Sequence, residues 1–387
     1  MVSDSILNPL TKQRIEFIDL LKCFAIFSVL WAHSIGYLMV GWDFSTDQVH
    51  KFFVTYHMPV FFMISGFFFS SSLKLSFKEV LWRRFTVLII PHITWNIIIG
   101  LVDWGMTFAS WNTPFNNKSF TFFSQLQAFF TPNPLTELWF FKDLFLVDLI
   151  VFTSCRIFKK RYVAFIGSML FVLLFGFFGV IGKTQRFLMP IFWTGMLLKA
   201  YYPIFCKHLN KILIISGISF LVCFYFYDTT YMIYARDFPP LINFQQSLAE
   251  GKIVFNFTNI GISGLRSLTG IVGSIFFFTL FQRFWKKNTV TSFLSHCGQV
   301  TVGIYVIQII VLQKIMHNTV NFANVNIWIY RLIITPITAA LVLGICVLII
   351  KLIQRNKRLA FILFGSSVID HGFVDSENQR QTSTHLA

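Results

Sequence analysis

Long apolar stretches alternate with polar connections along most of the chain. Each stretch is about 18 residues or longer, which lets a helix cross the ~30 Å hydrocarbon core of a bilayer. Ten such stretches are found, at about 15–40, 49–72, 82–102, 137–157, 162–182, 185–202, 210–228, 257–281, 298–316 and 326–351. The pattern predicts an all-α integral membrane fold with about ten transmembrane helices. We expect a transmembrane domain over residues 1–365 and a polar, disordered tail over 366–387.

The composition excludes most soluble classes of protein. Of the 387 residues, 55% are hydrophobic, 12% are charged and 50 are phenylalanine. A soluble fold of this size cannot hide so much apolar surface. A soluble enzyme, a disordered protein and a small disulfide scaffold are therefore excluded. The net charge of +16 would suggest nucleic acid in a soluble protein, but here the basic residues cluster between the apolar runs, which indicates membrane topology.

The distribution of Lys and Arg predicts the orientation. Ten spans place both termini on one side, and that side carries 21 Lys and Arg residues against 7 on the other. Because cytoplasmic loops are enriched in these residues, we expect both termini in the cytoplasm. The first apolar run begins near Ile15 and has no small-residue cleavage site, so we interpret it as a retained helix.

The cysteines and other metal-ligating residues show no site pattern. The six cysteines lie mostly inside or beside apolar runs, and none belongs to a C-x-x-C pair. Neither a zinc site nor a disulfide framework is therefore indicated, and no bound metal is expected.

The first span contains three ionisable residues that point to function. Asp19 and Lys22 are three residues apart and share a helix face. His33 follows Lys22 by eleven residues, close to three full turns and ~16 Å along the axis. Lys22 and His33 therefore line one stripe at two depths. Ionisable groups in a membrane are functional candidates by default. The structural alternative is a self-neutralising Asp19–Lys22 pair and a histidine bonded to a neighbouring helix.

The second span presents a histidine and a small-residue motif. His57 enters from the outer side and should reach a depth similar to that of the first-span histidine. Met58-Pro59 can be a simple kink, and Ser65-Gly66 a close helix contact. Both structural roles are compatible with a site there.

The third and fourth spans add charged groups at their ends. Arg83 and Arg84 lie at the cytoplasmic mouth of the third span, where they can anchor topology or bind phosphate groups. Trp139, Lys142 and Asp143 lie near the outer boundary of the fourth span. The last two are interpreted either as an interfacial ion pair or as a substrate contact.

Taken together, these motifs resemble acyltransferase family 3, the ten-helix bacterial membrane acyltransferases that include O-antigen and other polysaccharide O-acetyltransferases. The resemblance covers roughly residues 15–310. The motifs are specific in their order and spacing. They are Ile18-Asp19-Leu20-Leu21-Lys22 with His33, His57-Met58-Pro59 with Phe62-Met63-Ile64-Ser65-Gly66-Phe67, Arg83-Arg84 with Ile90-Pro91, Leu138-Trp139-Phe140-Phe141-Lys142-Asp143-Leu144, Gly195-Met196-Leu197-Leu198-Lys199, and Gly303-Ile304-Tyr305.

Three positions depart from the family pattern. Lys22 stands where the family usually has arginine, eleven residues before its histidine. Arg84 matches the first of two arginines three apart, whereas Val87 occupies the second position and Arg83 is an additional neighbour. Gln308 replaces a frequent histidine after the Gly-Ile-Tyr segment.

The resemblance implies transfer of an acyl group, usually acetyl, from cytoplasmic acyl-CoA to a hydroxyl of a cell-surface saccharide at the bacterial inner membrane. Acyl-CoA would be a co-substrate, with no bound cofactor and no nucleic-acid partner. His33 would be the general base, with Lys22 and Asp19 beside it in the catalytic set. Arg83, Arg84 and Lys22 would bind the donor. The groups expected to line the acceptor side are His57, Ser65, Trp139, Lys142, Asp143, Tyr305 and Gln308.

Two other classes of function remain open from the sequence. A transporter or flippase could use Lys22, Asp19 and His33 as an intramembrane relay, although no repeated halves are visible. A polyprenol-dependent glycosyltransferase would place acidic residues in an outer loop, as Asp43 and Asp47 could be. The sequence does not fix the acceptor, the acyl group or the oligomeric state.

Overall fold

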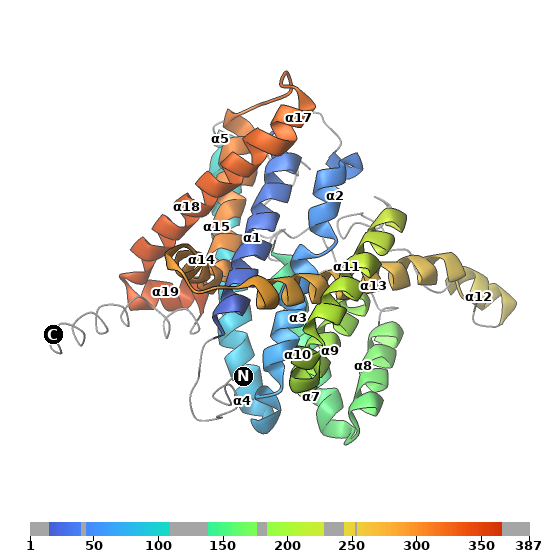
Figure 1. Cartoon of the computed structure of the whole chain (residues 1–387). Coiled ribbons are helices and arrows are strands. Elements are labelled where there is room, and N and C mark those ends of the chain that lie inside the picture. Colours follow the sequence, from blue (N-terminus) through green and yellow to red (C-terminus); the bar gives the residue numbers. More distant parts are fainter. Residues whose placement is uncertain are drawn as a thin grey trace.

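The computed structural model describes residues 15–39, 44–108, 138–175, 184–227, 244–251 and 254–365. The predicted tail at 366–387 lies outside these residues. The described chain is built of helices (Figure 1). The first half contains α1 (Glu16–Tyr37), η2 (Phe44–Thr46), α2 (Gln48–Val54), α3 (His57–Phe69), η3 (Ser72–Lys74), α4 (Phe77–Arg84), η4 (Phe85–Ile89), α5 (Ile90–Phe108), α7 (Trp139–Ile157), α8 (Arg161–Phe175) and α9 (Gln185–Ala200).

The second half begins with the short helix α10 and ends with α19, which packs against α5. Its elements are α10 (Tyr202–Lys207), α11 (Leu209–Phe226), α12 (Phe244–Glu250), α13 (Phe257–Phe284), α14 (Thr289–Gln299), α15 (Thr301–Gln308), η7 (Ile309–Met316), α16 (His317–Thr319), α17 (Ile327–Ile329), η8 (Tyr330–Ile334), α18 (Thr335–Gln354) and α19 (Lys357–Phe364).

Six helical segments of the described chain are long and apolar enough to cross a membrane. They are Glu16–Tyr37, Gln48–Phe69, Phe77–Met106, Leu209–Phe226, Phe257–Phe284 and Ile327–Gln354. A seventh is formed if Thr289–Gln299 and Thr301–Thr319, which meet at a bend of 67°, are counted together. The chain is therefore a multi-pass helical membrane protein.

The other three predicted spans also correspond to helices, but they do not meet the same criteria. The helix α7 is 19 residues long and contains Lys142, Asp143, Asp148 and Arg156, whereas α9 has only 16 residues. The described part of α8 has 15. The total of about ten spans and the cytoplasmic termini therefore remain predictions from the sequence.

Glycines allow the closest helix contacts. A Cβ on Gly66 of α3 would collide with the carbonyl oxygen of Phe192, and one on Gly195 of α9 would collide with that of Met63. Gly298 of α14 lies in the same way against the backbone of Asp19 in α1. Small residues let membrane helices approach at the backbone. The sequence interpretation of Ser65-Gly66 as a close contact is correct for the glycine.

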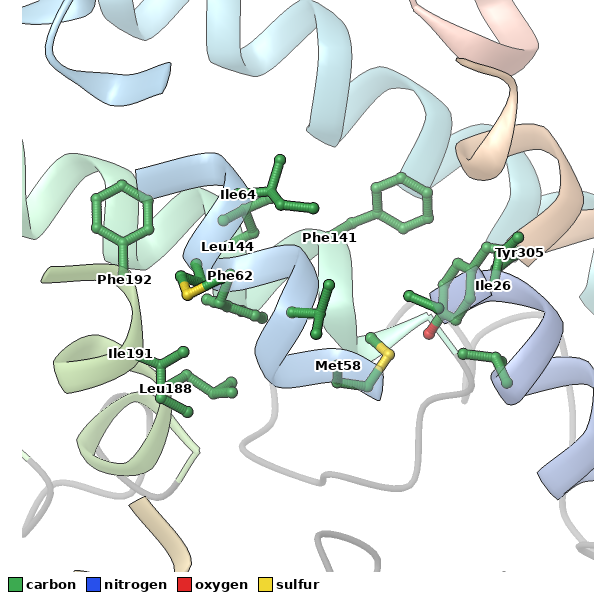
Figure 2. Packing of buried hydrophobic residues seen from close by; sticks show 14 of the residues in the cluster. Ile26, Met58, Phe62, Ile64, Phe141, Leu144, Leu188, Ile191, Phe192 and Tyr305 are labelled. Carbon is green, nitrogen blue, oxygen red and sulfur yellow. The ribbon is translucent and has the colours of Figure 1, made fainter. Parts of the chain in front are cut away.

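A single large apolar cluster joins the central helices. Figure 2 shows Met58 and Phe62 of α3 in this cluster, with Ile191 of α9 and with Phe141 of α7. Tyr305 of α15 and Ile26 of α1, two helices in contact with each other, belong to the same cluster. The central helices α1, α3, α7 and α15 thus share one core, which fixes the polar side chains that they carry.

The predicted kink near Pro59 is a break between α2 and α3, a few residues earlier in the chain. Thr55 and Tyr56 separate the two helices. Proline has no amide hydrogen, so it cannot bond the carbonyl one turn before it. At the break, the carbonyl oxygen of Phe53 accepts from the Tyr56 amide at 3.3 Å and from the ring of His57 at 2.6 Å.

Candidate active site

His33 lies on α1, half-buried, with one ring nitrogen bound to α15. Its Nδ1 is 2.9 Å from Oε1 of Gln308, which is fully buried. The amide of Gln308 is oriented by a second bond, in which Nε2 donates to the carbonyl oxygen of Tyr305 at 3.2 Å. Because an amide oxygen can only accept, Nδ1 of His33 carries the hydrogen. Its Nε2 therefore keeps the lone pair that a base needs.

A second glutamine reaches the same ring. Gln313 is five residues after Gln308 and lies within η7, which is π-helical. The wider turn of a π-helix lets both side chains approach His33. Nε2 of Gln313 lies 3.4 Å from Nδ1, and because both atoms carry hydrogen when Nδ1 donates to Gln308, this is a contact and not a hydrogen bond. Oε1 of Gln313 is buried and accepts no hydrogen bond from the described residues. Sequence reasoning missed Gln313, because an α-helical register would place it on another face.

A buried ion pair holds this π-helical segment. Nζ of Lys314 lies 2.9 Å from Asp103 of α5, and the two side chains are 2% and 4% exposed. Lys314 is one of the seven Lys and Arg residues predicted on the outer side, and nothing in its sequence neighbourhood indicates a partner. Close by in the chain, Arg331 of η8 pairs with Asp47, which also caps α2 through the amide of His50. These contacts tie the elements after α15 to the helices around His33.

Two further histidines face the first. Nδ1 of His57 donates to the carbonyl oxygen of Phe53, so its Nε2 keeps a lone pair; this atom is buried and has no hydrogen-bond partner among the described residues. His50 of α2 interacts electrostatically with both His33 and His57. His57 and His50 therefore both lie within electrostatic range of His33, and no pattern in the sequence singles out His50.

Asp19 and Lys22 form a pair at the other end of α1. Lys22 Nζ is 2.6 Å from Asp19 Oδ1, and the lysine side chain keeps 25% of its surface exposed. Both residues and His33 lie on the unbroken helix α1, so the expected stripe is present. Eleven residues correspond to ~16 Å along that helix, too far for direct contact between Lys22 and His33.

Arg84 is already engaged by the protein. Its Nε lies 3.0 Å from Oδ2 of Asp148, a fully buried carboxylate on α7. Its guanidinium also lies over the ring of Phe69, 5.7 Å from the centroid. Arg83, the preceding residue, is exposed. Sequence reasoning missed Asp148, because its partner lies more than sixty residues earlier in the chain.

Lys142 and Asp143 have different neighbours. Asp143 is buried, and its Oδ1 accepts from Nε2 of Gln185 at 2.6 Å, at the start of α9. Lys142 is half-buried and interacts electrostatically with His92 of α5. Asp143 also interacts electrostatically with Lys142, so the two side chains are neighbours of each other as well as of α5 and α9.

The remaining predicted residues lie on α3, α7 and α15. Trp139 is buried at the start of α7. The ring of Tyr305 lies 5.8 Å from those of Phe140 and Phe141, so α7 contacts the helix that carries Gln308. Ser65 is half-buried beside the α3–α9 contact. Asp43, one of the two acidic residues considered for an outer-loop site, lies outside the described residues.

The chemistry that the arrangement offers is that of a base. Within the described ranges, no three His, Cys, Asp or Glu side chains come together as metal ligands. What the site offers is an imidazole with a fixed tautomer, reachable because it is half-buried, and a ring of neutral hydrogen-bonding groups around it.

The comparison with protein families gives one match. A family model described as an acyltransferase domain matches residues 15–353, nearly the whole chain. No curated protein and no solved structure matches the sequence.

Proposed function

The chain belongs to acyltransferase family 3, and from this premise we propose that it is a membrane O-acyltransferase of the bacterial inner membrane. The donor is cytoplasmic acyl-CoA, with acetyl as the group transferred. The acceptor is a hydroxyl of a cell-surface saccharide. The observation that carries the proposal is the bond between Nδ1 of His33 and Oε1 of Gln308, which leaves Nε2 of a half-buried histidine to act as a base.

In the proposed step, Nε2 of His33 removes the proton of the acceptor hydroxyl as its oxygen attacks the thioester carbonyl carbon. The tetrahedral intermediate then collapses, and the C–S bond breaks. The leaving thiolate takes the proton from the imidazolium. A positioned base of this kind contributes about 10²- to 10⁴-fold. Gln308 stabilises the imidazolium because its oxygen already accepts the Nδ1 hydrogen.

The groups near His33 suit the recognition of a hydroxylated acceptor. The buried Oε1 of Gln313 can accept a hydrogen bond from a second hydroxyl. Lys142 and His57 are the groups that we assign to the developing oxyanion or to acceptor orientation. Trp139 and Tyr305 supply the apolar wall on the α7 and α15 side.

We assign the phosphate groups of the donor to the basic side chains at the predicted cytoplasmic end. Arg83 and Lys22 keep exposed surface, which lets them reach a soluble ligand. Arg84 presents a guanidinium that Asp148 and Phe69 hold in place. Asp19 supports Lys22 through its ion pair.

The alternative of a transporter relay receives less support. A proton relay through Lys22, Asp19 and His33 needs hydrogen-bond contact or bridging groups between them. The ~16 Å between Lys22 and His33 along α1 leaves them without direct contact.

The test is acyl transfer from radiolabelled acetyl-CoA into glycan, in membranes that carry wild type, His33→Ala or His296→Ala at matched protein levels. His296 is an exposed histidine that bonds within α14, so it controls for histidine replacement. We expect label in wild type and His296→Ala and its loss in His33→Ala. Equal incorporation by His33→Ala would remove His33 as the base and direct attention to His57 or His92.

A further inference from the structure

A second site lies where α10 gives way to α11, against the end of α13. The pocket here has a volume of roughly 510 Å³. The side chains that line it include Lys207, His208, Asn210, Lys211, Gln282 and Arg283. We call it the α10–α11 pocket. None of its residues belongs to the group around His33.

The pocket collects positive charge from three helices. Lys207 ends α10, Lys211 lies in the first turn of α11 and Arg283 lies in the last turn of α13. No Asp or Glu is among the residues that line it. The start of α11 adds the positive end of an 18-residue helix, and its first residue follows His208, which makes no side-chain capping bond. The pocket is therefore suited to an anion.

Hydrogen bonds between protein side chains position two of the residues that line the pocket. Nε of Arg283 donates to Oδ1 of Asn210 at 2.9 Å, which orients the guanidinium. Nε2 of Gln282 donates to the hydroxyl of Tyr202 at 2.9 Å. Oε1 of Gln282 is buried and accepts no hydrogen bond from the described residues.

The surroundings place the pocket at the edge of the bilayer. An apolar, exposed surface of α11 begins one turn beyond Lys211. The exposed fractions of its residues range from 52% to 80%, at Ile214, Ile215, Ile218, Leu221, Val222 and Tyr225. Lys287, four residues after Arg283, pairs with Glu16 at 3.3 Å, so the pocket lies at the same end of the bundle as the start of α1. The Lys and Arg distribution predicts that this end is cytoplasmic.

We propose that the α10–α11 pocket binds the headgroup of an anionic phospholipid of the cytoplasmic leaflet. The phosphodiester is held by Lys207, Lys211 and Arg283, because ammonium and guanidinium groups form charge-assisted bonds with phosphate. The acyl chains lie along the exposed face of α11. Phosphatidylglycerol is an anionic phospholipid of this kind, whereas phosphatidylcholine carries no net charge.

The test is native mass spectrometry of the full-length chain in detergent, with equimolar phosphatidylglycerol and phosphatidylcholine of identical acyl chains. The pocket variant is Lys207→Gln/Lys211→Gln/Arg283→Gln. The control variant removes the same charge from exposed residues before and at the start of α8, Lys159→Gln/Lys160→Gln/Arg161→Gln. Each basic residue near a membrane surface contributes about fivefold in binding, so three contribute on the order of 100-fold.

We expect wild type and the control variant to retain phosphatidylglycerol in preference to phosphatidylcholine, and the pocket variant to lose that preference. Equal loss in the control variant would overturn the proposal, because it would show only general surface charge. Equal retention of both lipids by wild type would also overturn it. So would displacement of the lipid by millimolar inorganic phosphate or CoA, which would assign the pocket to a soluble phosphate. Lys211 is exposed, so the single change Lys211→Gln repeats the test without the triple substitution. It should weaken the binding of phosphatidylglycerol about fivefold.

Discussion

Replacing Gln308 with leucine tests how the protein sets the state of His33. Leucine keeps much of the volume of the buried side chain but cannot accept the Nδ1 hydrogen of His33, which Gln308 Oε1 now holds at 2.9 Å. A buried donor left without its partner costs about 1 to 3 kcal/mol. If that loss falls on the transition state, in which the ring becomes an imidazolium, kcat should drop roughly 5- to 150-fold.

The assay is steady-state acyl transfer by purified protein with varied acyl-CoA concentration. We expect kcat to fall and KM for acyl-CoA to stay close to the wild-type value, because Gln308 lies on α15, away from the basic residues assigned to the donor. Gln308→His should restore most of the activity, since imidazole can also accept from Nδ1. Gln299→Leu, at the half-buried last residue of α14, serves as the control amide and should leave kcat unchanged.

A Gln308→Leu enzyme with wild-type kcat would refute this account of His33. So would an effect confined to KM, because it would place Gln308 in donor binding. If Gln308→His is as inactive as Gln308→Leu, the loss of activity would indicate a packing role for the glutamine.

Three further predictions follow from the packing and from the charges. Gly298→Ala should lower the free energy of unfolding in detergent by about 1 to 3 kcal/mol, because the new Cβ would collide with the backbone of α1. Gly344→Ala, where the new Cβ would meet open space, should leave the free energy of unfolding unchanged. Lys314→Met should cost about 3 to 5 kcal/mol by leaving Asp103 buried without its cation, and adding Asp103→Asn should recover much of it in the same unfolding measurement. Arg83→Gln should raise KM for acyl-CoA severalfold with little change in unfolding temperature, because its side chain is exposed.

Each of these has a clear contrary result. Equal stability of the two glycine variants would contradict the close α14–α1 contact. A double variant no more stable than Lys314→Met would show that the ion pair is not the source of the loss. An unchanged KM in Arg83→Gln would remove that residue from the proposed donor site.

The sequence predicts the helices better than the contacts between them. The spacing of Asp19, Lys22 and His33 predicts their arrangement, because an unbroken helix fixes the relative positions of its own residues. Gly66 is predicted as a contact because a small residue in an apolar helix has few other uses. Both inferences depend only on local structure.

The features that the sequence did not predict depend on distant partners or on irregular backbone. Lys314 and Asp103 are 211 residues apart, and no local pattern reveals that they are paired. Gln313 reaches His33 only because η7 is π-helical, which changes the register after Gln308. Asp148 pairs with Arg84 from another helix, and no spacing within the fourth span indicates that partner. The span count is a separate matter. The helix α7 carries four charged residues and α9 has only 16 residues, so length and apolar composition do not identify either helix as a span.

In the proposed reaction, Nε2 of His33 is the base that removes the proton of the acceptor hydroxyl. The most direct measurement compares kcat of purified wild type and His33→Ala with acetyl-CoA and a saccharide acceptor, after matched folding has been shown by thermal unfolding. The account predicts a fall of about 10²- to 10⁴-fold, the usual contribution of a general base, with little change in KM for acetyl-CoA. A His33→Ala enzyme whose kcat stays within a few fold of wild type would contradict it.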